Sequence, residues 1–423
     1  MSGAPAPATR LPLLRAWWIA DRAGMLRAVA LVLSAVSFVL LLPGLMKDGG
    51  AGFVVNNVVI HLYVLAWLML ATVGVRSIGA REVLTAYFLG TFLVPVVVFV
   101  PLIPIVRWLG TGNPALATWW VPPFEEAGLL AGTMLIAWRL CRRPGRLPGV
   151  LDLMVVGWSV GAGLAIHEDG MYRRFLPGLD EGGSLAGAFG GPYGAIFPTF
   201  YESPWGYLTT YHAGSGAIFG ITVGLVVMFR HRLPLVRWIV PVVWLHATID
   251  HAVYNDHLWN DTSPLRFLTA NGHLQPVVLL LAVPALLAFE HWRRRRVDLG
   301  LPGFGWAGVR EAARRGHGFL PKATRLLAYG QYHRARNAAL AAAWARPGEP
   351  APAIDRIEDW GRIAFAPASP EVAERSTGEA PSETAHAAPP PPAPPPPRPA
   401  PADPPDARAP SSSDDDGSAQ SES

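Results

Sequence analysis

Five ionisable side chains that could bind a metal ion or move a proton lie inside otherwise apolar stretches of this sequence. They are Glu125, Glu126, Glu168, His212 and His246. A charged group at the centre of a bilayer costs about 2.5–3.5 kcal/mol on insertion scales, so such groups usually face the interior of a helix bundle and pair with one another. Two imidazoles with one or two carboxylates form the ligand set that zinc prefers, and three protein ligands plus a water make a catalytic site. A further carboxylate beside that water can serve as a general base, and adjacent glutamates suit this work.

The stretches that carry these residues are long enough to cross a membrane. The chain of 423 residues is 51% hydrophobic and only 16% charged. About eight segments reach or approach the ~20 apolar residues that a membrane helix needs. They lie near 26–46, 53–75, 84–106, 118–138, 149–168, 212–229, 236–254 and 274–290. The sequence therefore predicts an all-α fold, a polytopic membrane bundle of about eight transmembrane helices.

The arginines predict how this bundle lies in the membrane, because loops rich in Lys and Arg stay in the cytoplasm. Rich and poor loops alternate along the chain, and "RRRR" at 293–296 follows the last span. An even number of spans with both termini in the cytoplasm fits this alternation. We therefore expect a multi-pass protein of the cell membrane, with the lipid bilayer as its surroundings. The formal charge of +4 follows mostly from this topology, and no nucleic-acid module is found.

This topology places the ionisable residues at a similar depth in the outer halves of four consecutive spans. The span near 236–254 also carries Asp250 and His251, and Asp250 shares a helix face with His246 because the two are four residues apart. Small residues every four positions, as at Gly216, Gly220 and Gly224 after His212, let helices approach closely in lipid. The sequence therefore predicts that these side chains converge on one site.

The chain divides into four predicted regions. Residues 1–25 form a cytoplasmic N-terminal segment, and 26–290 form the transmembrane domain. Residues 291–350 are basic and helix-prone, as expected for a cytoplasmic helix at the membrane surface. Residues 351–423 are rich in Pro, Ala, Ser and Asp and are expected to be a disordered cytoplasmic tail. The single cysteine, Cys141, excludes an intrachain disulfide and a cysteine-rich zinc site.

Four ordered motifs resemble a known family. They are "FEEAGLL", "GAGLAIHEDGMY", "YHAGSGAIFGITVG" and "WLHATIDHAVYN". Together, in this order and in a membrane setting, they resemble the PrsW family of intramembrane metalloproteases, which is related to the CAAX prenyl endopeptidases and the bacteriocin-processing proteases. The sequence departs from the family pattern after the glutamate pair, where Leu129 or Leu130 replaces a basic residue.

The resemblance implies hydrolysis of peptide bonds in a membrane-spanning or membrane-anchored protein, near the extracytoplasmic side. Anti-sigma factors are an example of such substrates in the family. It implies zinc as the cofactor, held by Glu168, His212 and His246. Glu125 is expected to activate the bound water, and Glu126 or Asp250 is expected to orient groups or protonate the leaving amine. The roles can be exchanged among the carboxylates.

Two other interpretations remain open from the sequence. Intramembrane Glu, Asp and His side chains also build proton relays, so a proton- or ion-coupled transporter or a membrane sensor would use the same cluster. The lack of an internal repeat counts against most transporter designs. A protease-like protein that has lost its metal and only binds membrane partners is the third interpretation.

Overall fold

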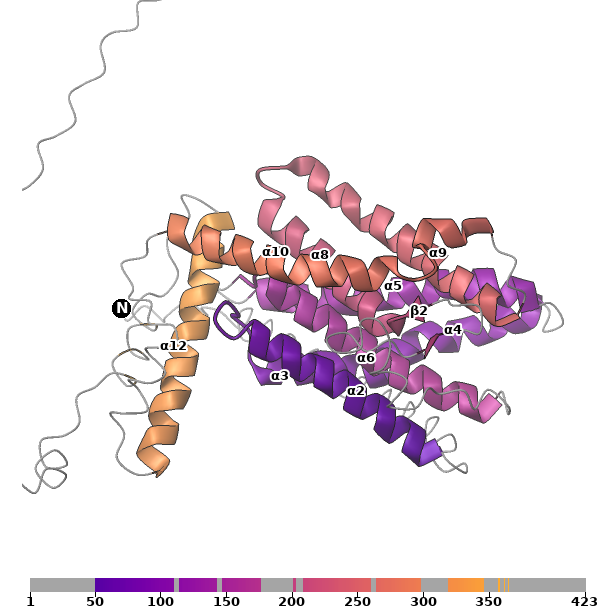
Figure 1. Cartoon of the computed structure of the whole chain (residues 1–423), viewed down its shortest axis with the longest axis horizontal. Helices are drawn as coiled ribbons and strands as arrows, with labels where there is room; N and C mark the ends of the chain where they lie inside the picture. The colour runs from indigo at the N-terminus through magenta and orange to yellow at the C-terminus, as the bar shows by residue number, and fades with distance from the viewer. Residues whose placement is uncertain are drawn as a thin grey trace, which may run out of the picture. The chain divides into compact units, whose positions relative to one another are not determined.

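A computed structural model of the chain describes residues 50–109, 114–142, 147–175, 201–202, 208–259, 264–297 and 319–345, together with 357, 361 and 364. These residues are almost entirely helical, in agreement with the predicted all-α fold (Figure 1). The long helices are α2 (Gly50–Ala71), α3 (Ala80–Phe88), α4 (Val94–Leu109), α5 (Pro114–Cys141), α6 (Val150–Phe175), α8 (Tyr211–Phe229), α9 (Ile239–Trp259), α10 (Leu274–Arg296) and α12 (Phe319–Ala345). The shorter turns are η1 (Leu89–Leu93), η2 (Pro234–Trp238) and η3 (Pro264–Thr269). In the described part, strands occur only as β1 (Tyr201–Glu202) paired antiparallel with β2 (Leu208–Thr209).

Four helices within the described residues are long and apolar enough to cross a membrane. They are Ala80–Leu102, Val150–Glu168, His212–Phe229 and Pro264–Arg296. Every predicted span that falls on described residues overlaps a helix. The helices α5 and α9 are less apolar than these four, because both carry several polar side chains. The predicted span near 26–46 and the N-terminal segment 1–25 lie outside the described residues, so eight spans and the cytoplasmic termini stay predictions.

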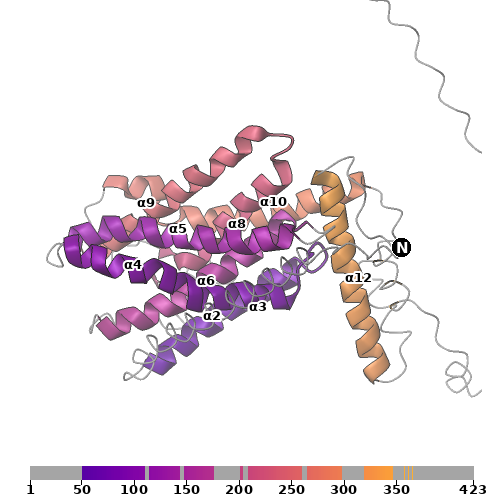
Figure 2. The ribbon, with the colours of Figure 1, turned by 180° about the vertical axis from the view of Figure 1, so that it is seen from behind.

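The helix α6 lies at the centre of the bundle. All residues from Val150 to Glu168 are buried, which is expected of a helix that is apolar on every side. It contacts α2, α3, η1, α5 and α8, and the two opposite views show α6 passing among these neighbours (Figures 1 and 2). A polar residue on α6 is therefore held inside the protein rather than against lipid.

Glycines allow α6 and α8 to pack backbone against backbone. A Cβ atom added to Gly157 would lie 1.9 Å from the carbonyl oxygen of Gly216, and one added to Gly161 would lie 1.9 Å from that of His212. Neither separation is possible for a real side chain, so only glycine permits this approach. The stripe of small residues predicted from Gly216, Gly220 and Gly224 faces α6, because a Cβ on Gly220 or Gly224 would also meet the α6 backbone.

A π-helical turn, η1, joins α3 to α4 without a break. Pro95 follows this turn and has no N–H, so it cannot donate the helical hydrogen bond to the residue one turn before it. That residue is Thr91, whose backbone forms a hydrogen bond with the side chain of His167. His167 therefore contacts η1, and its ring also stacks on Phe99 of α4 with 6.2 Å between the ring centroids.

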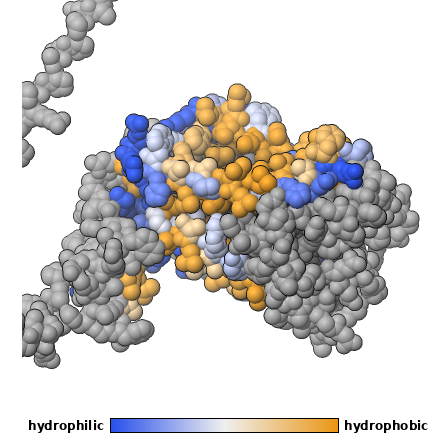
Figure 3. Space-filling model, viewed as in Figure 1, coloured by the Kyte–Doolittle hydropathy of each residue, from blue (hydrophilic) through white to orange (hydrophobic). Residues whose placement is uncertain are grey.

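Large apolar side chains cover the outer faces of several helices. Trp120 and Trp138 on α5 are 51% and 52% exposed, and Val242 on α9 is 65% exposed. Figure 3 shows hydrophobic residues over the middle of one face, with hydrophilic residues towards two ends. An apolar surface of this extent needs a non-aqueous partner, and together with the four long apolar helices it indicates association with a membrane.

The helix α12 lies within the predicted basic region 291–350. Its Trp344 ring packs 5.2 Å from Phe229 and 5.6 Å from Phe289 between ring centroids. The guanidinium of Arg232 lies 4.0 Å over the Trp344 ring and donates a hydrogen bond of 2.8 Å to its carbonyl oxygen. Packing also continues beyond the predicted boundary at 350, because Ile357 and Ala364 are helical and buried. The remainder of the predicted tail lies outside the described residues.

Candidate metal centre

The helix α5 brings two carboxylates into the bundle. Glu125 and Glu126 are each 1% exposed. Adjacent residues on a helix point about 100° apart, so both can be buried only where the helix has neighbours on two sides. The helix α5 packs against α6, α8 and α9, and it thereby holds both carboxylates in the interior.

The close packing of α6 on α8 sets Glu168 beside His212. Gly161 meets the backbone of His212, and Glu168 lies two helical turns further along the same face of α6. Side chains of a helix lean towards its N-terminus, so His212, at the start of α8, extends past Gly161 towards Glu168. The result is a direct contact of Nε2 of His212 with Oε2 of Glu168.

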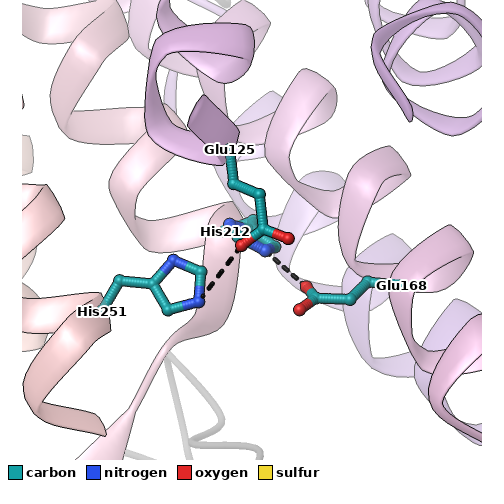
Figure 4. Close-up of side chains that lie close together, drawn as sticks. All are labelled: Glu125, Glu168, His212 and His251. Carbon is teal, nitrogen blue, oxygen red and sulfur yellow. Dashed lines mark hydrogen bonds and ion pairs between the residues drawn. The ribbon is translucent and has the colours of Figure 1, made fainter. Parts of the chain in front are cut away.

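The helix α9 completes the group with His251. Its Nε2 atom lies 3.4 Å from Oε2 of Glu125, and the centroids of the His251 and His212 rings are 5.0 Å apart. Glu125, Glu168, His212 and His251 each offer one ligand atom, and these atoms all lie within 4.8 Å of one another. Figure 4 shows the four side chains pointing towards a common centre from four helices. The chain therefore has a buried Glu/His group that could hold a metal ion.

Glu126 lies behind both imidazoles. Its Oε1 atom is 3.1 Å from Nδ1 of His251 and 3.5 Å from Nδ1 of His212. Histidine ligands usually direct the second ring nitrogen at a carboxylate, which fixes the tautomer and the orientation of the ring. With Nδ1 of each ring facing Glu126, both Nε2 atoms are left to face Glu125 and Glu168.

The unsatisfied atoms of the site fit a bound cation. Within the described residues, Oε2 of Glu125 and Oε2 of Glu126 are buried and accept no hydrogen bond. A buried carboxylate oxygen that accepts no hydrogen bond is costly, and a divalent cation among carboxylate oxygens and imidazole nitrogens removes that cost. Two imidazoles and two carboxylates are also a donor set that zinc accepts. The residues present therefore fit the zinc site that the sequence predicts, although the geometry does not specify the metal.

His246 is absent from this group of potential ligands, and its role as a metal ligand stays a prediction. The ring of His246 forms a hydrogen bond with the backbone of Leu268, in η3. His251 lies five positions later, about 140° further round the helix at ~100° per residue, and it takes the place assigned to His246. The sequence contains no signal that separates the two, because both lie in the outer half of one apolar segment.

Asp250 is also absent from the group of four potential ligands. Its Oδ2 atom accepts a hydrogen bond of 2.7 Å from Nε2 of Gln275 on α10. The same amide nitrogen lies 3.2 Å from the hydroxyl of Ser215 on α8, and Thr210 donates to the amide oxygen. This network ties α8, α9 and α10 together beside the site. A catalytic role for Asp250 stays a prediction.

Replacement of the two histidines of α9 separates the predicted ligand from the one in the cluster. His251→Ala is expected to reduce the zinc content of the purified protein to background, because the variant removes a nitrogen donor from the group. His246→Ala is the matched control, with the same substitution on the same helix, and should keep its zinc. Metal analysis of both variants decides the point, and loss of zinc from His246→Ala alone would restore the original prediction.

Comparison of the chain with models of known families, with curated proteins and with solved structures gives no match.

Proposed function

We propose that this protein is a membrane-embedded, zinc-dependent endopeptidase that hydrolyses peptide bonds of membrane-spanning or membrane-anchored proteins. The convergence of Glu125, Glu168, His212 and His251 within 4.8 Å carries the proposal. The resemblance of the four motifs to the PrsW metalloproteases supports it, because three of these four residues lie at the motif positions that the resemblance assigns to the site. The fourth, His251, lies in the fourth motif as well.

In this proposal His212, His251 and Glu168 hold the metal ion. An ion held by these residues would lower the pKa of a bound water molecule to about 7 and would polarise the scissile carbonyl group. The two imidazoles present Nε2 to the centre of the site, since Nδ1 of each faces Glu126. Their orientation is thus set before substrate arrives, as catalysis by positioned groups requires.

Glu125 is the general base in this proposal. Its Oε2 atom is buried, accepts no hydrogen bond from the described residues and lies 3.4 Å from Nε2 of His251. A carboxylate with a free oxygen at the centre of the site can accept a proton from water and then return it to the leaving amine. Oε1 of Glu126 already faces two imidazoles, so we assign Glu126 to the positioning of the histidines instead of to proton transfer.

The site lies at the end of the bundle away from most of the arginines, although Arg173 and Arg174 follow Glu168 on α6, and this distribution supports cleavage near the extracytoplasmic side. His212 is at the start of α8, and Arg230 and Arg232 follow the end of that helix. Likewise, Glu168 is near the end of α6, and Glu125 precedes Arg139 on α5 by about four turns. From the distribution of arginines we expect the opposite end to be cytoplasmic.

Cleavage of defined membrane peptides tests the proposed activity. The purified protein is placed in lipid vesicles with a panel of labelled single-span peptides, and the fragments are identified by mass. We expect cuts near the extracytoplasmic end of susceptible peptides that stop when a chelator removes the metal and resume when zinc is restored. Cleavage that is unaffected by complete removal of metal would contradict the proposal.

Glu126→Gln tests the positioning role of Glu126. The amide keeps the size of the side chain but weakens the hydrogen bond with Nδ1 of His251 and the 3.5 Å contact with Nδ1 of His212. Loss of such a partner typically costs about 10–100-fold in metal affinity. We expect a weaker zinc affinity of this size with an unchanged thermal unfolding midpoint in the absence of metal. Glu82→Gln, at the start of α3, is the control. Zinc affinity equal to that of the control would remove Glu126 from this role.

A further inference from the structure

Four consecutive arginines end α10, and two of them turn inward. Arg293 is 1% exposed and Arg294 is partly buried, whereas Arg295 and Arg296 are exposed. Exposed arginines are sufficient to fix the orientation of a membrane helix. Burial of a guanidinium group removes its hydration and is costly without a partner. The burial of Arg293 and Arg294 therefore needs a reason other than membrane orientation.

Three segments meet at these two arginines. Arg294 donates through Nη1 to the carbonyl oxygen of Gly74, in the turn that follows α2, and His333 of α12 forms a hydrogen bond of 3.0 Å with the same oxygen. Asn337 of α12 donates a 3.0 Å hydrogen bond to the carbonyl oxygen of Arg76. The end of α10, the turn after α2 and the helix α12 are thereby joined. The charge of Asp152 acts on both Arg76 and Arg294, and Arg293 pairs with Glu290. We call Arg76, Arg293 and Arg294 the arginine cluster.

The nearby carboxylates do not neutralise this cluster. Both oxygens of Asp152 accept hydrogen bonds from the backbone, with Ser77 N at 2.9 Å and Gly149 N at 2.8 Å. Glu290 pairs through Oε2 with Arg293 alone. No carboxylate oxygen of the described residues lies within ion-pair distance of Arg76 or Arg294. Positive charge therefore exceeds negative charge at this place.

Several N–H groups of the cluster have no acceptor. The buried nitrogen atoms of the cluster that form no hydrogen bond with the described residues are Nε of Arg76, Nη1 of Arg293, and Nε and Nη2 of Arg294. A guanidinium carries five N–H groups that cannot be deprotonated, so each unfilled donor requires an external acceptor. Burial and the neighbouring charges of Arg294, Arg336 and Arg334 together lower the pKa of His333 to about 4. The histidine is consequently neutral at pH 7 and adds no charge, and its surroundings are already positive.

We propose that the arginine cluster binds a phosphate group at the cytoplasmic end of the bundle. Phosphate oxygens accept hydrogen bonds and match the paired donors of guanidinium groups, so they satisfy the free Nε and Nη2 atoms of Arg294 together. The position, at the end of a membrane helix, suits the headgroup of an anionic phospholipid, and free phosphate offers the same chemistry. This site lies at the opposite end of the bundle from the candidate metal centre and does not depend on the proposed hydrolysis.

Thermal unfolding of the full chain in a neutral detergent tests the site. Short-chain phosphatidic acid, short-chain phosphatidylcholine and inorganic phosphate are added separately, and binding is taken from the rise of the unfolding midpoint with concentration. We expect saturable stabilisation by phosphatidic acid and none by phosphatidylcholine at the same concentration. Stabilisation by inorganic phosphate at comparable concentration assigns the site to free phosphate, and its absence assigns it to a lipid headgroup. No stabilisation by either anion overturns the proposal.

Matched arginine variants identify the residues responsible. Arg294→Gln is expected to weaken the binding by about tenfold or more, since a hydrogen bond to a charged group contributes roughly 1.5–3 kcal/mol. Arg295→Gln removes the same charge from an exposed neighbour and should bind as the unaltered protein does. Equal weakening in the two variants means that only general surface charge is involved and overturns the proposal. If Arg294→Gln does not fold, Arg76→Gln provides the same comparison from the turn after α2.

Discussion

Glu125→Gln is expected to lower the rate of peptide cleavage by about 10²–10⁴-fold, the usual contribution of a positioned general base. The substitution preserves the size of the side chain and the packing of α5, but an amide cannot take a proton from water. Because Glu125 is buried at 1% exposure among two histidines and Glu168, no solvent-exposed carboxylate can replace it. The measurement is the initial rate of cleavage of a susceptible labelled peptide in vesicles.

The metal content of Glu125→Gln serves as the control for this prediction. If His212, His251 and Glu168 hold the ion, the variant keeps its zinc while it loses activity. A variant that loses zinc as well shows that Glu125 is a ligand and that a different carboxylate is the base. Cleavage at the unaltered rate, with zinc bound, would remove Glu125 from the mechanism.

Gly161→Ala is expected to damage the site through the backbone. The added Cβ would lie 1.9 Å from the carbonyl oxygen of His212, so α6 and α8 must separate at the place where Glu168 and His212 meet. Overpacking of this kind costs typically about 1–3 kcal/mol in the free energy of unfolding. We expect a lower unfolding midpoint and, in addition, weaker zinc binding, because the two ligands move apart.

Two other glycines provide the comparison for Gly161→Ala. Gly157→Ala makes an equally close contact, with the carbonyl oxygen of Gly216, but about one helical turn further from the ligands. It should lower the unfolding midpoint with a smaller loss of zinc. Gly74→Ala, where no atom lies within 4 Å of the added Cβ, should change neither. An unaltered midpoint in Gly161→Ala would contradict the close packing of α6 on α8.

The sequence predicted the helical fold and most of the candidate site for a definite physical reason. Burial of a charged group in an apolar helix costs free energy unless the group pairs with another polar group. The sequence therefore predicts that Glu125, Glu126, Glu168 and His212 face one another. The glycine stripe on α8 similarly predicted a close helix contact. Both predictions require only the residue type and its approximate depth in the membrane. The depth can be estimated from the position of the residue within its apolar segment.

The choice between His246 and His251 could not be made in the same way. It depends on the rotation of α9 about its axis, which the packing of α5 and α8 and the network of Asp250 with Gln275 determine. The helical period relates His246 to Asp250 but does not say which face of α9 turns inward. The role of Glu126 behind both imidazoles likewise depends on contacts among three helices.

The sequence did not reveal the arginine cluster. The run "RRRR" at 293–296 fits the positive charge expected on the cytoplasmic side, and the local pattern gives no signal of a second role for these arginines. Only the burial of Arg293 and Arg294 against the turn after α2 and against α12 separates them from Arg295 and Arg296. Contacts between segments more than two hundred residues apart are not visible in local sequence patterns.

X-ray absorption at the zinc edge of the purified, zinc-loaded protein tests the central claim most directly. The proposed site predicts one bound zinc per chain, coordinated only by nitrogen and oxygen, with the scattering signature of two imidazole rings. The zinc signal should be lost in His251→Ala and in His212→Ala, and the two-ring signature should remain in His246→Ala. A zinc ion without imidazole ligands, or a protein that binds no divalent metal, would contradict the account.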